Sequence, residues 1–298
     1  MTYRFGLALI CGLLLVPGVG GAKEDTFDSN GVKIHYLVEG EGEPVLLIHG
    51  FAVNSSLQWV APGIFKALAK DHRVIALDLR GHGKSDKPTD PKEYGTKMVE
   101  DVVRLLDHLK IKKAHVVGYS MGAVITGKLM VTHPDRVRSA TLGGAGVVYE
   151  GMEWPPFIDE LVDSLEKGKG IGPLLVALTP PGRSQPPEVV IEQANRMLVG
   201  GNGKALAAVV RSWKTLAVSE KQMKANKVPV LALIGEKDPL KKNVEDIKDR
   251  LANLQVVVID GSDHLTAFTR PKFVKSLSKF LDEHRQKKKE KVPAGAGK

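Results

Sequence analysis

Short apolar runs, each closed by a turn residue, recur along most of the chain. Residues 32–38 alternate apolar and polar positions, which predicts a strand. Residues 44–48 form a continuous apolar run that ends at His49, and residues 73–77 form another that ends at Asp78. Runs of this length between turn residues are typical of strands buried on both faces of a parallel sheet.

Amphipathic segments separate these runs and predict helices. We expect helices over residues 59–70, 96–109, 123–133, 244–251 and 273–284. Further strands are expected over residues 114–117, 137–142, 228–234 and 254–259. Strands that alternate with helices predict an α/β fold with a mostly parallel central sheet and helices on both faces. Ligands in such sheets bind beyond the carboxyl ends of the strands, so the chemistry is expected just after the apolar runs.

The alternation stops at residue 147 and returns near residue 219. Residues 147–218 contain helical stretches and three proline pairs, and no segment in them has the pattern of a buried strand. We therefore expect a helical cap inserted into the sheet domain. The α/β core then comprises residues 23–146 plus 219–284, and residues 285–298 form a basic, flexible tail.

Composition and charge exclude several classes of protein. A chain of 298 residues with 43% hydrophobic content suits one large α/β domain. The formal net charge is +9, and much of the excess lies in the last residues. Aromatic residues make up only 5% of the chain and do not interleave with a basic stripe, so no nucleic-acid partner is expected.

The N-terminus has the layout of a secretory signal peptide. Arg4 precedes an apolar run over residues 5–16, and small residues lead to Ala22. A membrane anchor is the alternative, but the run is shorter than the ~18 residues that span a bilayer. We expect residues 1–22 to be a signal peptide and the mature chain to be exported, periplasmic or secreted, with no membrane span. Cleavage would remove Cys11, the only cysteine, and with it any disulfide or thiolate metal site.

Ser120 is the best candidate for chemistry. It follows the predicted strand 114–117, precedes a predicted helix, and lies between Gly118 and Gly122 in a G-x-S-x-G pattern. This strand-turn-helix setting is that of a nucleophile elbow, in which the strained serine needs small neighbours two residues away on each side. The N-terminus of the following helix also favours developing negative charge.

A serine nucleophile needs a base and a third group that orients the base. His264 follows the last predicted strand in a turn, which makes it the candidate base. Asp238 follows the preceding strand, and Asp260 and Asp263 are the rival acids. Asp263 adjoins His264 in sequence and is poorly placed to orient its ring. The order Ser120, Asp238, His264 is the one that this elbow requires.

Two backbone amides are expected to form an oxyanion hole. One is the N–H of Met121, the residue after the nucleophile, and the other is the N–H of Phe51, in the loop after the strand 44–48. Two N–H groups that point at the oxyanion can stabilise a transition state by several kcal/mol. In a well-studied case, removing one such donor costs roughly 3–4 kcal/mol. This chemistry needs no cofactor and no metal.

Five motifs in this order and spacing, "HGF", "LDLRGHGKSD", "VVGYSMGA", "IGEKDPL" and "GSDHL", resemble the α/β-hydrolase fold superfamily over residues 32–284. The resemblance implies a mostly parallel sheet, a helical cap, and a triad at Ser120, Asp238 and His264. It also implies that the stretch from Asp78 to Ser85 shapes a loop beside the site. Epoxide hydrolases and haloalkane dehalogenases resemble this chain but carry an aspartate at the nucleophile position, and the chain lacks the HGGG run of one esterase branch.

The sequence therefore predicts a serine hydrolase, with a carboxylic ester of small to medium size and partly apolar character as the substrate. Carbon–carbon bond hydrolysis or perhydrolysis with the same triad is an alternative, and a non-catalytic binding protein on this fold is another. The expected partner is a small molecule, and the sequence indicates no particular oligomeric state.

Overall fold

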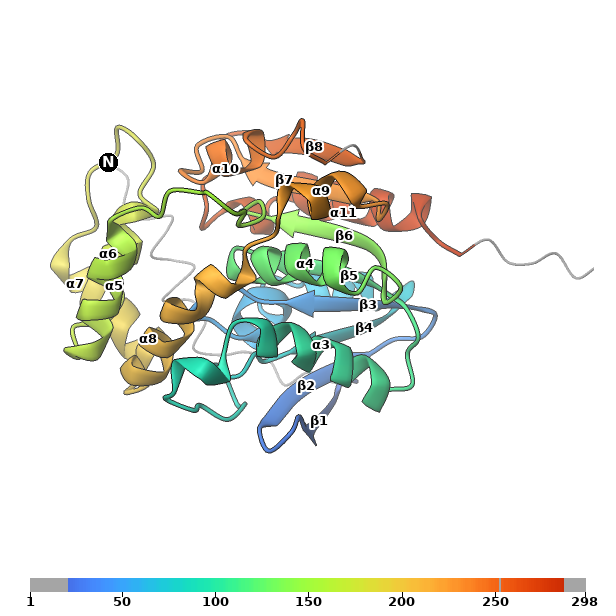
Figure 1. Ribbon diagram of the computed structural model, residues 1–298, viewed down its shortest axis with the longest axis horizontal. Coiled ribbons are helices and arrows are strands. Elements are labelled where there is room, and N and C mark those ends of the chain that lie inside the picture. Colours follow the sequence, from blue (N-terminus) through green and yellow to red (C-terminus); the bar gives the residue numbers. More distant parts are fainter. Residues whose placement is uncertain (1–20, 252, 287–298) are drawn as a thin grey trace, which may run out of the picture.

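A sheet of eight strands forms the middle of the molecule in the computed structural model, which describes residues 21–251 and 253–286 (Figure 1). The strands are β1 (Lys23–Asp28), β2 (Lys33–Glu39), β3 (Glu43–Ile48), β4 (His72–Leu77), β5 (Ala114–Tyr119), β6 (Val137–Gly143), β7 (Val230–Gly235) and β8 (Leu254–Ile259). Their order across the sheet is β1-β2-β4-β3-β5-β6-β7-β8. Strand β2 is antiparallel to both of its neighbours, and all other pairs are parallel. The predicted α/β class with a mostly parallel sheet is confirmed.

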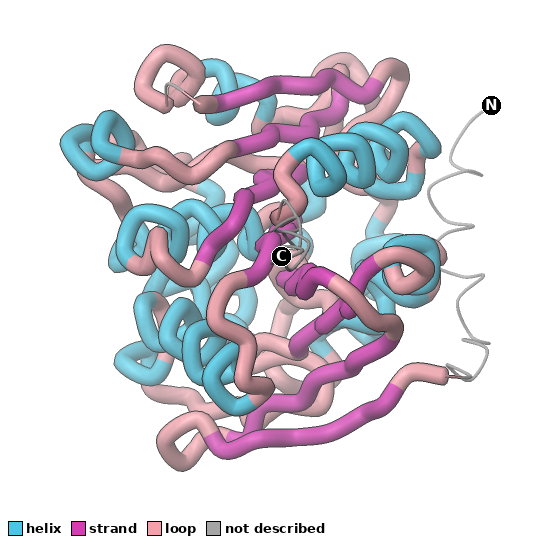
Figure 2. Tube along the Cα trace, turned by 90° about the vertical axis from the view of Figure 1, so that its right-hand side faces the viewer, coloured by secondary structure: helices cyan, strands magenta, loops and turns pink. Residues whose placement is uncertain are grey.

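Helices cover both faces of this sheet (Figure 2). Alternate residues of β3 face opposite sides, because Leu46 and Ile48 pack in one apolar cluster and Val45 and Leu47 in another. The first face is covered by α3 (Thr96–His108) and α4 (Met121–Thr132), and the second by α2 (Ile64–Leu68) and α11 (Pro271–Glu283). Burial on both sides explains why the central strands are continuous apolar runs in the sequence.

Helices fill the segment between β6 and β7. They are α5 (Phe157–Glu166), α6 (Gly172–Ala177), α7 (Glu188–Ala194), α8 (Gly203–Ser212) and α9 (Glu220–Ala225). An isolated parallel bridge joins Tyr149 to Val218, near the two ends of the predicted cap. In Figure 1, α5 to α8 gather beside the edge of the sheet toward which the arrows of β3 and β6 point. The cap therefore stands at the carboxyl ends of the strands, where ligands of such sheets bind.

Two predicted helices differ from those observed. The expected helix 59–70 is a single π-type turn over Ser56–Val60 followed by α2. Between them, Pro62 has no N–H to donate and Gly63 has a φ of 81°, and both break the helix. The expected helix 244–251 is α10 (Lys241–Glu245), which begins earlier and is followed by tight turns up to Arg250.

Strand β1 has no counterpart among the predicted strands. Its sequence, KEDTFD, is mostly charged, and only Phe27 is buried. It pairs with β2 alone, as an edge strand, where exposed charge is common because it discourages pairing with other chains.

Parts of the predicted terminal segments lie outside the described residues. Residues 1–20 of the predicted signal peptide and residues 287–298 of the predicted tail belong to these parts. Over residues 21–251 and 253–286, no helix has both the length and the apolar character needed to cross a bilayer.

A buried ion pair fastens the loop after β4 to helix α3. The Arg80 guanidinium donates from Nε and Nη2 to the two carboxylate oxygens of Asp101, at 2.6 Å each, and the Ser29 hydroxyl donates to Asp101 Oδ1 at 2.6 Å. Asp101 is fully buried and the Arg80 side chain is only 2% exposed. Removing one partner of such a pair leaves a buried charge uncompensated.

We expect Asp101→Asn to lower the free energy of unfolding by about 3–5 kcal/mol, because the buried Arg80 guanidinium then keeps only the partly exposed Glu93 carboxylate, 3.4 Å from its Nη1. Urea unfolding followed by circular dichroism measures this loss. Asp107→Asn on the same helix is the control, since Asp107 is 63% exposed where it pairs with Arg136, and its loss should stay below about 1 kcal/mol. Equal effects of the two substitutions would contradict the assignment.

Candidate active site

Ser120 occupies a sharp turn between β5 and α4. Its φ of 54° and ψ of −118° lie in a region that L-residues rarely adopt. A Cβ on Gly118 would lie 2.0 Å from the carbonyl oxygen of Gly122, and a Cβ on Gly122 would lie 2.2 Å from the carbonyl oxygen of Ile48. Both positions therefore require glycine, and together they hold Ser120 at the start of α4, as an elbow requires.

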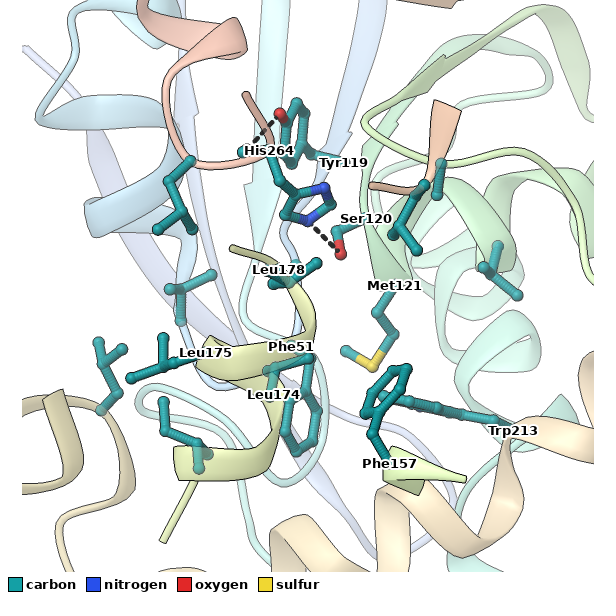
Figure 3. Close-up of a pocket in the computed structure, with 18 of the residues that line it drawn as sticks. Phe51, Tyr119, Ser120, Met121, Phe157, Leu174, Leu175, Leu178, Trp213 and His264 are labelled. Carbon is teal, nitrogen blue, oxygen red and sulfur yellow. Dashed lines mark hydrogen bonds between the residues drawn. The ribbon is translucent and has the colours of Figure 1, made fainter. Parts of the chain in front are cut away.

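The structure brings Ser120, Asp238 and His264 together at the carboxyl edge of the sheet. His264 Nε2 lies 3.0 Å from Ser120 Oγ (Figure 3). On the other side of the ring, His264 Nδ1 lies 3.0 Å from Asp238 Oδ2. His264 and Asp238 are each 4% exposed. Because a carboxylate only accepts hydrogen bonds, the contact with Asp238 holds the hydrogen on Nδ1 and leaves Nε2 free to accept a hydrogen bond from the Ser120 hydroxyl.

The two rival carboxylates have other partners. Asp260 pairs with Lys272 on the surface. Asp263 accepts hydrogen bonds from the Leu265 N–H and the Thr266 hydroxyl within its own turn, and it pairs with Arg183 of the cap at 3.1 Å. Neither is bonded to the His264 ring, which leaves Asp238 as the carboxylate that orients it.

The backbone amides of Phe51 and Met121 are the two predicted oxyanion donors. Met121 is the first residue of α4, and such an N–H has no acceptor within its helix. The Phe51 N–H makes no hydrogen bond to another described residue. The loop before Phe51 lies against the serine, since a Cβ on Gly50 would stand 3.3 Å from Ser120 Cβ. Both amides are thus available as oxyanion donors.

Buried histidine and tyrosine side chains fix the loops around Ser120. His49 Nδ1–H donates to the Gly50 carbonyl at 2.7 Å, and the Leu79 N–H donates to His49 Nε2 at 3.0 Å. Burial lowers the pKa of His49, which keeps the ring neutral and able to serve as donor and acceptor at once. The buried Tyr119 hydroxyl donates to the His264 carbonyl at 2.7 Å. Burial, then the nearby Asp238 and Asp263, raise the pKa of Tyr119, so the hydroxyl keeps its proton.

A cavity of about 310 Å³ opens from Ser120 and His264 into the cap (Figure 3). On the cap side it is lined by Phe157, Ile158, Leu174, Leu175, Leu178, Ala194, Met197, Leu198 and Trp213. On the core side it is lined by Phe51, Gln58, Met121, Leu265 and Phe268, among others. No Asp, Glu, Lys or Arg belongs to this lining. The lining therefore offers apolar contacts on the cap side and no side-chain carboxylate, ammonium or guanidinium to pair with a charged ligand.

Sequence reasoning identified Ser120, Asp238 and His264 but did not single out Gln58 or Asn243, which also line the cavity. Gln58 lies in the π-type turn over Ser56–Val60, and nothing in the sequence of that stretch shows which side chain points inward. In the described part of the chain, no group of three or more His, Cys, Asp or Glu side chains is arranged to hold a metal ion.

Comparison with known families gives one match, to the α/β-hydrolase fold model over residues 43–169. Among curated proteins, epoxide hydrolase 3 of Siraitia grosvenorii is 36% identical over 115 residues, 38% of this chain and 36% of that protein. A 2-hydroxymuconate semialdehyde hydrolase of Pseudomonas sp. (strain CF600) is 36% identical over 129 residues, 41% of this chain and 45% of that protein. The matched segment thus spans less than half the length of these relatives.

Solved structures match over almost the whole chain. The enol-lactonase of Burkholderia xenovorans LB400 gives a TM-score of 0.73 at 23% identity, over 87% of this chain and 100% of that one. The 2-hydroxy-6-oxo-6-phenylhexa-2,4-dienoate hydrolase of Rhodococcus sp. strain RHA1 gives 0.68 at 24% identity, over 88% and 98%. The sheet topology and these structural matches show that the chain has the α/β-hydrolase fold, and the family model for this fold matches its residues 43–169.

Proposed function

We propose that this hydrolase cleaves a small to medium-sized, partly apolar carboxylic ester through an acyl-enzyme on Ser120. The observation that carries the proposal is the chain of hydrogen bonds from Ser120 through His264 to Asp238. Ser120 and His264 also line an apolar cavity that has no charged side chain of Asp, Glu, Lys or Arg in its wall. A nucleophile, its base and an orienting acid are the parts that acyl transfer needs.

The proposed reaction follows from the distances. His264 Nε2, 3.0 Å from Ser120 Oγ, takes the hydroxyl proton as the oxygen attacks the ester carbonyl carbon. The carbonyl oxygen becomes an oxyanion held by the Phe51 and Met121 N–H groups. His264 then gives the proton to the departing alcohol oxygen. Asp238 fixes the ring through Nδ1 and stabilises its charged form, and water releases the acid by the same steps.

Carbon–carbon bond hydrolysis is the second candidate, and the 2-hydroxymuconate semialdehyde hydrolases among the relatives favour it. One structural neighbour is a hydrolase of a dienoate, and a dienoate is a carboxylate. A carboxylate ligand needs a cationic or strongly donating partner in a buried site, because an unpaired buried charge is costly. The lining has no Lys or Arg, which favours an uncharged ester over a substrate of that kind.

Ser120→Ala should lower kcat/KM for p-nitrophenyl esters by about 10⁴-fold or more, since it removes the nucleophile and leaves only binding and the oxyanion donors. A fluorophosphonate probe should label the wild-type protein at Ser120 and leave the variant unlabelled, as read by mass spectrometry. Full activity in Ser120→Ala would overturn the role of this residue. An unlabelled wild type that cleaves none of the esters would favour a binding protein.

Asp238→Asn should lower kcat by about 10⁴-fold with little change in KM, because an amide holds the His264 ring in the wrong tautomer. Asp263→Asn is the matched control, since Asp263 adjoins the same histidine and bonds to Leu265, Thr266 and Arg183 instead. Its kcat should stay within about tenfold of the wild type. If Asp263→Asn were the more damaging change, the orienting acid would be misassigned.

We also propose export of this protein, directed by residues 1–22 and followed by cleavage near Ala22. The charged Arg4, the apolar run 5–16 and the small residues before Lys23 support this proposal. Material secreted by an expressing bacterium should begin at or close to Lys23 when its N-terminus is sequenced. A mature N-terminus well upstream of Lys23, or protein retained wholly in the cytoplasm, would refute it.

A further inference from the structure

Gln58 is a buried polar side chain with no hydrogen-bond partner for its amide nitrogen. It is 5% exposed, it belongs to the cavity lining, and Nε2 has no acceptor among the described residues. A buried amide left unpaired costs free energy, so such a group in a cavity wall calls for an explanation.

The Gln58 amide stands beside the reacting centre. A Cβ built on Gly50 would lie 3.4 Å from Gln58 Oε1 and 3.3 Å from Ser120 Cβ. The end of the glutamine and the nucleophile therefore flank the same glycine, at the loop that leads to the Phe51 N–H. An atom bound to Gln58 is consequently only a few bonds from a carbonyl that Ser120 attacks.

Three other polar side chains of the lining, those of Tyr119, Asn243 and Thr266, already make hydrogen bonds within the protein. The Tyr119 hydroxyl donates to the His264 carbonyl, and the Thr266 hydroxyl donates to Asp263 at 2.7 Å. Asn243 accepts from the Gly146 N–H at 2.8 Å. Besides Ser120 and His264, the described lining contains Gln58 and the indole groups of Trp154 and Trp213. Of these, Gln58 Nε2 and the Trp213 indole nitrogen are buried without a partner among the described residues.

We propose that the Gln58 side-chain amide binds a second, uncharged oxygen of the substrate, adjacent to the scissile ester group. The inference rests on the proposed esterase function and specifies its substrate class. This class comprises esters with a hydroxyl or carbonyl close to the ester and a hydrocarbon part that enters the cap. The last side-chain bond of glutamine has two nearly equivalent positions, so the amide can present its oxygen to a hydroxyl or its N–H to a carbonyl.

The first experiment compares matched substrates with the wild-type protein. Propyl hexanoate is paired with 2-hydroxyethyl hexanoate, and ethyl 3-methylhexanoate with ethyl 3-hydroxyhexanoate, so that a hydroxyl replaces a methyl beside the ester on either side. The kcat/KM of the oxygenated member should be higher by on the order of tenfold in at least one pair. No preference in either pair, with measurable turnover, overturns the proposal.

The second experiment replaces the amide with an apolar group of similar length. Gln58→Met should bring the kcat/KM ratio between the oxygenated and the plain ester of the preferred pair to about one. Gln255→Met is the control, because Gln255 is exposed on β8 and lies outside the cavity lining, and it should keep the preference. An equal loss on all four esters would place Gln58 on the scissile carbonyl or in a structural role, and would overturn the proposal.

A binding measurement separates this proposal from the proposed function. Titration calorimetry with Ser120→Ala compares 1,2-hexanediol with 1-hexanol, which needs no turnover. Tighter binding of the diol that disappears in the Ser120→Ala, Gln58→Met double variant supports the role of Gln58, even if the wild type cleaves no ester. Equal binding of both alcohols counts against Gln58 whether or not esters are cleaved.

Discussion

The close approach of three backbone segments beneath Ser120 is the constraint on which the site depends. The start of α4 lies against the end of β3 and the end of β5, so near that neither Gly118 nor Gly122 has room for a Cβ. This contact forces Ser120 into a positive φ, which costs about 1–3 kcal/mol for a residue other than glycine. In this conformation, Ser120 lies at the turn between β5 and α4, and the N–H of Met121, the first residue of α4, has no acceptor within the helix. The same contact brings the loop after β3, and with it Phe51, next to the nucleophile.

The other two members of the candidate triad are placed by backbone links between neighbouring strand ends. The Ser120 N–H donates to the Gly143 carbonyl after β5 and β6, and the Gly144 N–H donates to the Leu233 carbonyl of β7. The Lys237 N–H then donates to the Ser262 carbonyl, which joins the loop of Asp238 to the loop of His264. Each link fixes one loop relative to the next. These backbone links, together with the hydrogen bond from the Tyr119 hydroxyl to the His264 carbonyl, hold His264 at 3.0 Å from both Ser120 and Asp238.

Most of the core and the triad could be predicted because each has a local cause. Strands buried on both faces must be apolar throughout, and the turns that end them need glycine or aspartate, so both are visible in the sequence. Strand β1 could not be predicted in this way, because only its Phe27 is buried. Its other residues are exposed, so packing does not require them to be apolar. The inward position of Gln58 could not be predicted either. Whether a glutamine in a short helical turn faces solvent or a cavity depends on how distant segments pack around it. Likewise, the break at Gly63 is decided by a single positive φ inside an otherwise helical pattern.

The division between the matched and the unmatched parts of the chain has a physical basis. The family match ends at residue 169, so it includes the elbow and the oxyanion loop but not α6, α7, Asp238 or His264. The matched part is constrained by backbone contacts that tolerate little change, as at Gly118 and Gly122. The cap side of the cavity is constrained only by the need to exclude charge and fill volume, which many apolar side chains satisfy equally well. Proteins that share the first part can consequently act on epoxides, dienoates or lactones. Under the proposed function, substrate choice depends on the few cavity groups that apolar packing does not explain. Gln58, whose amide nitrogen has no partner among the described residues, is the group proposed for this role.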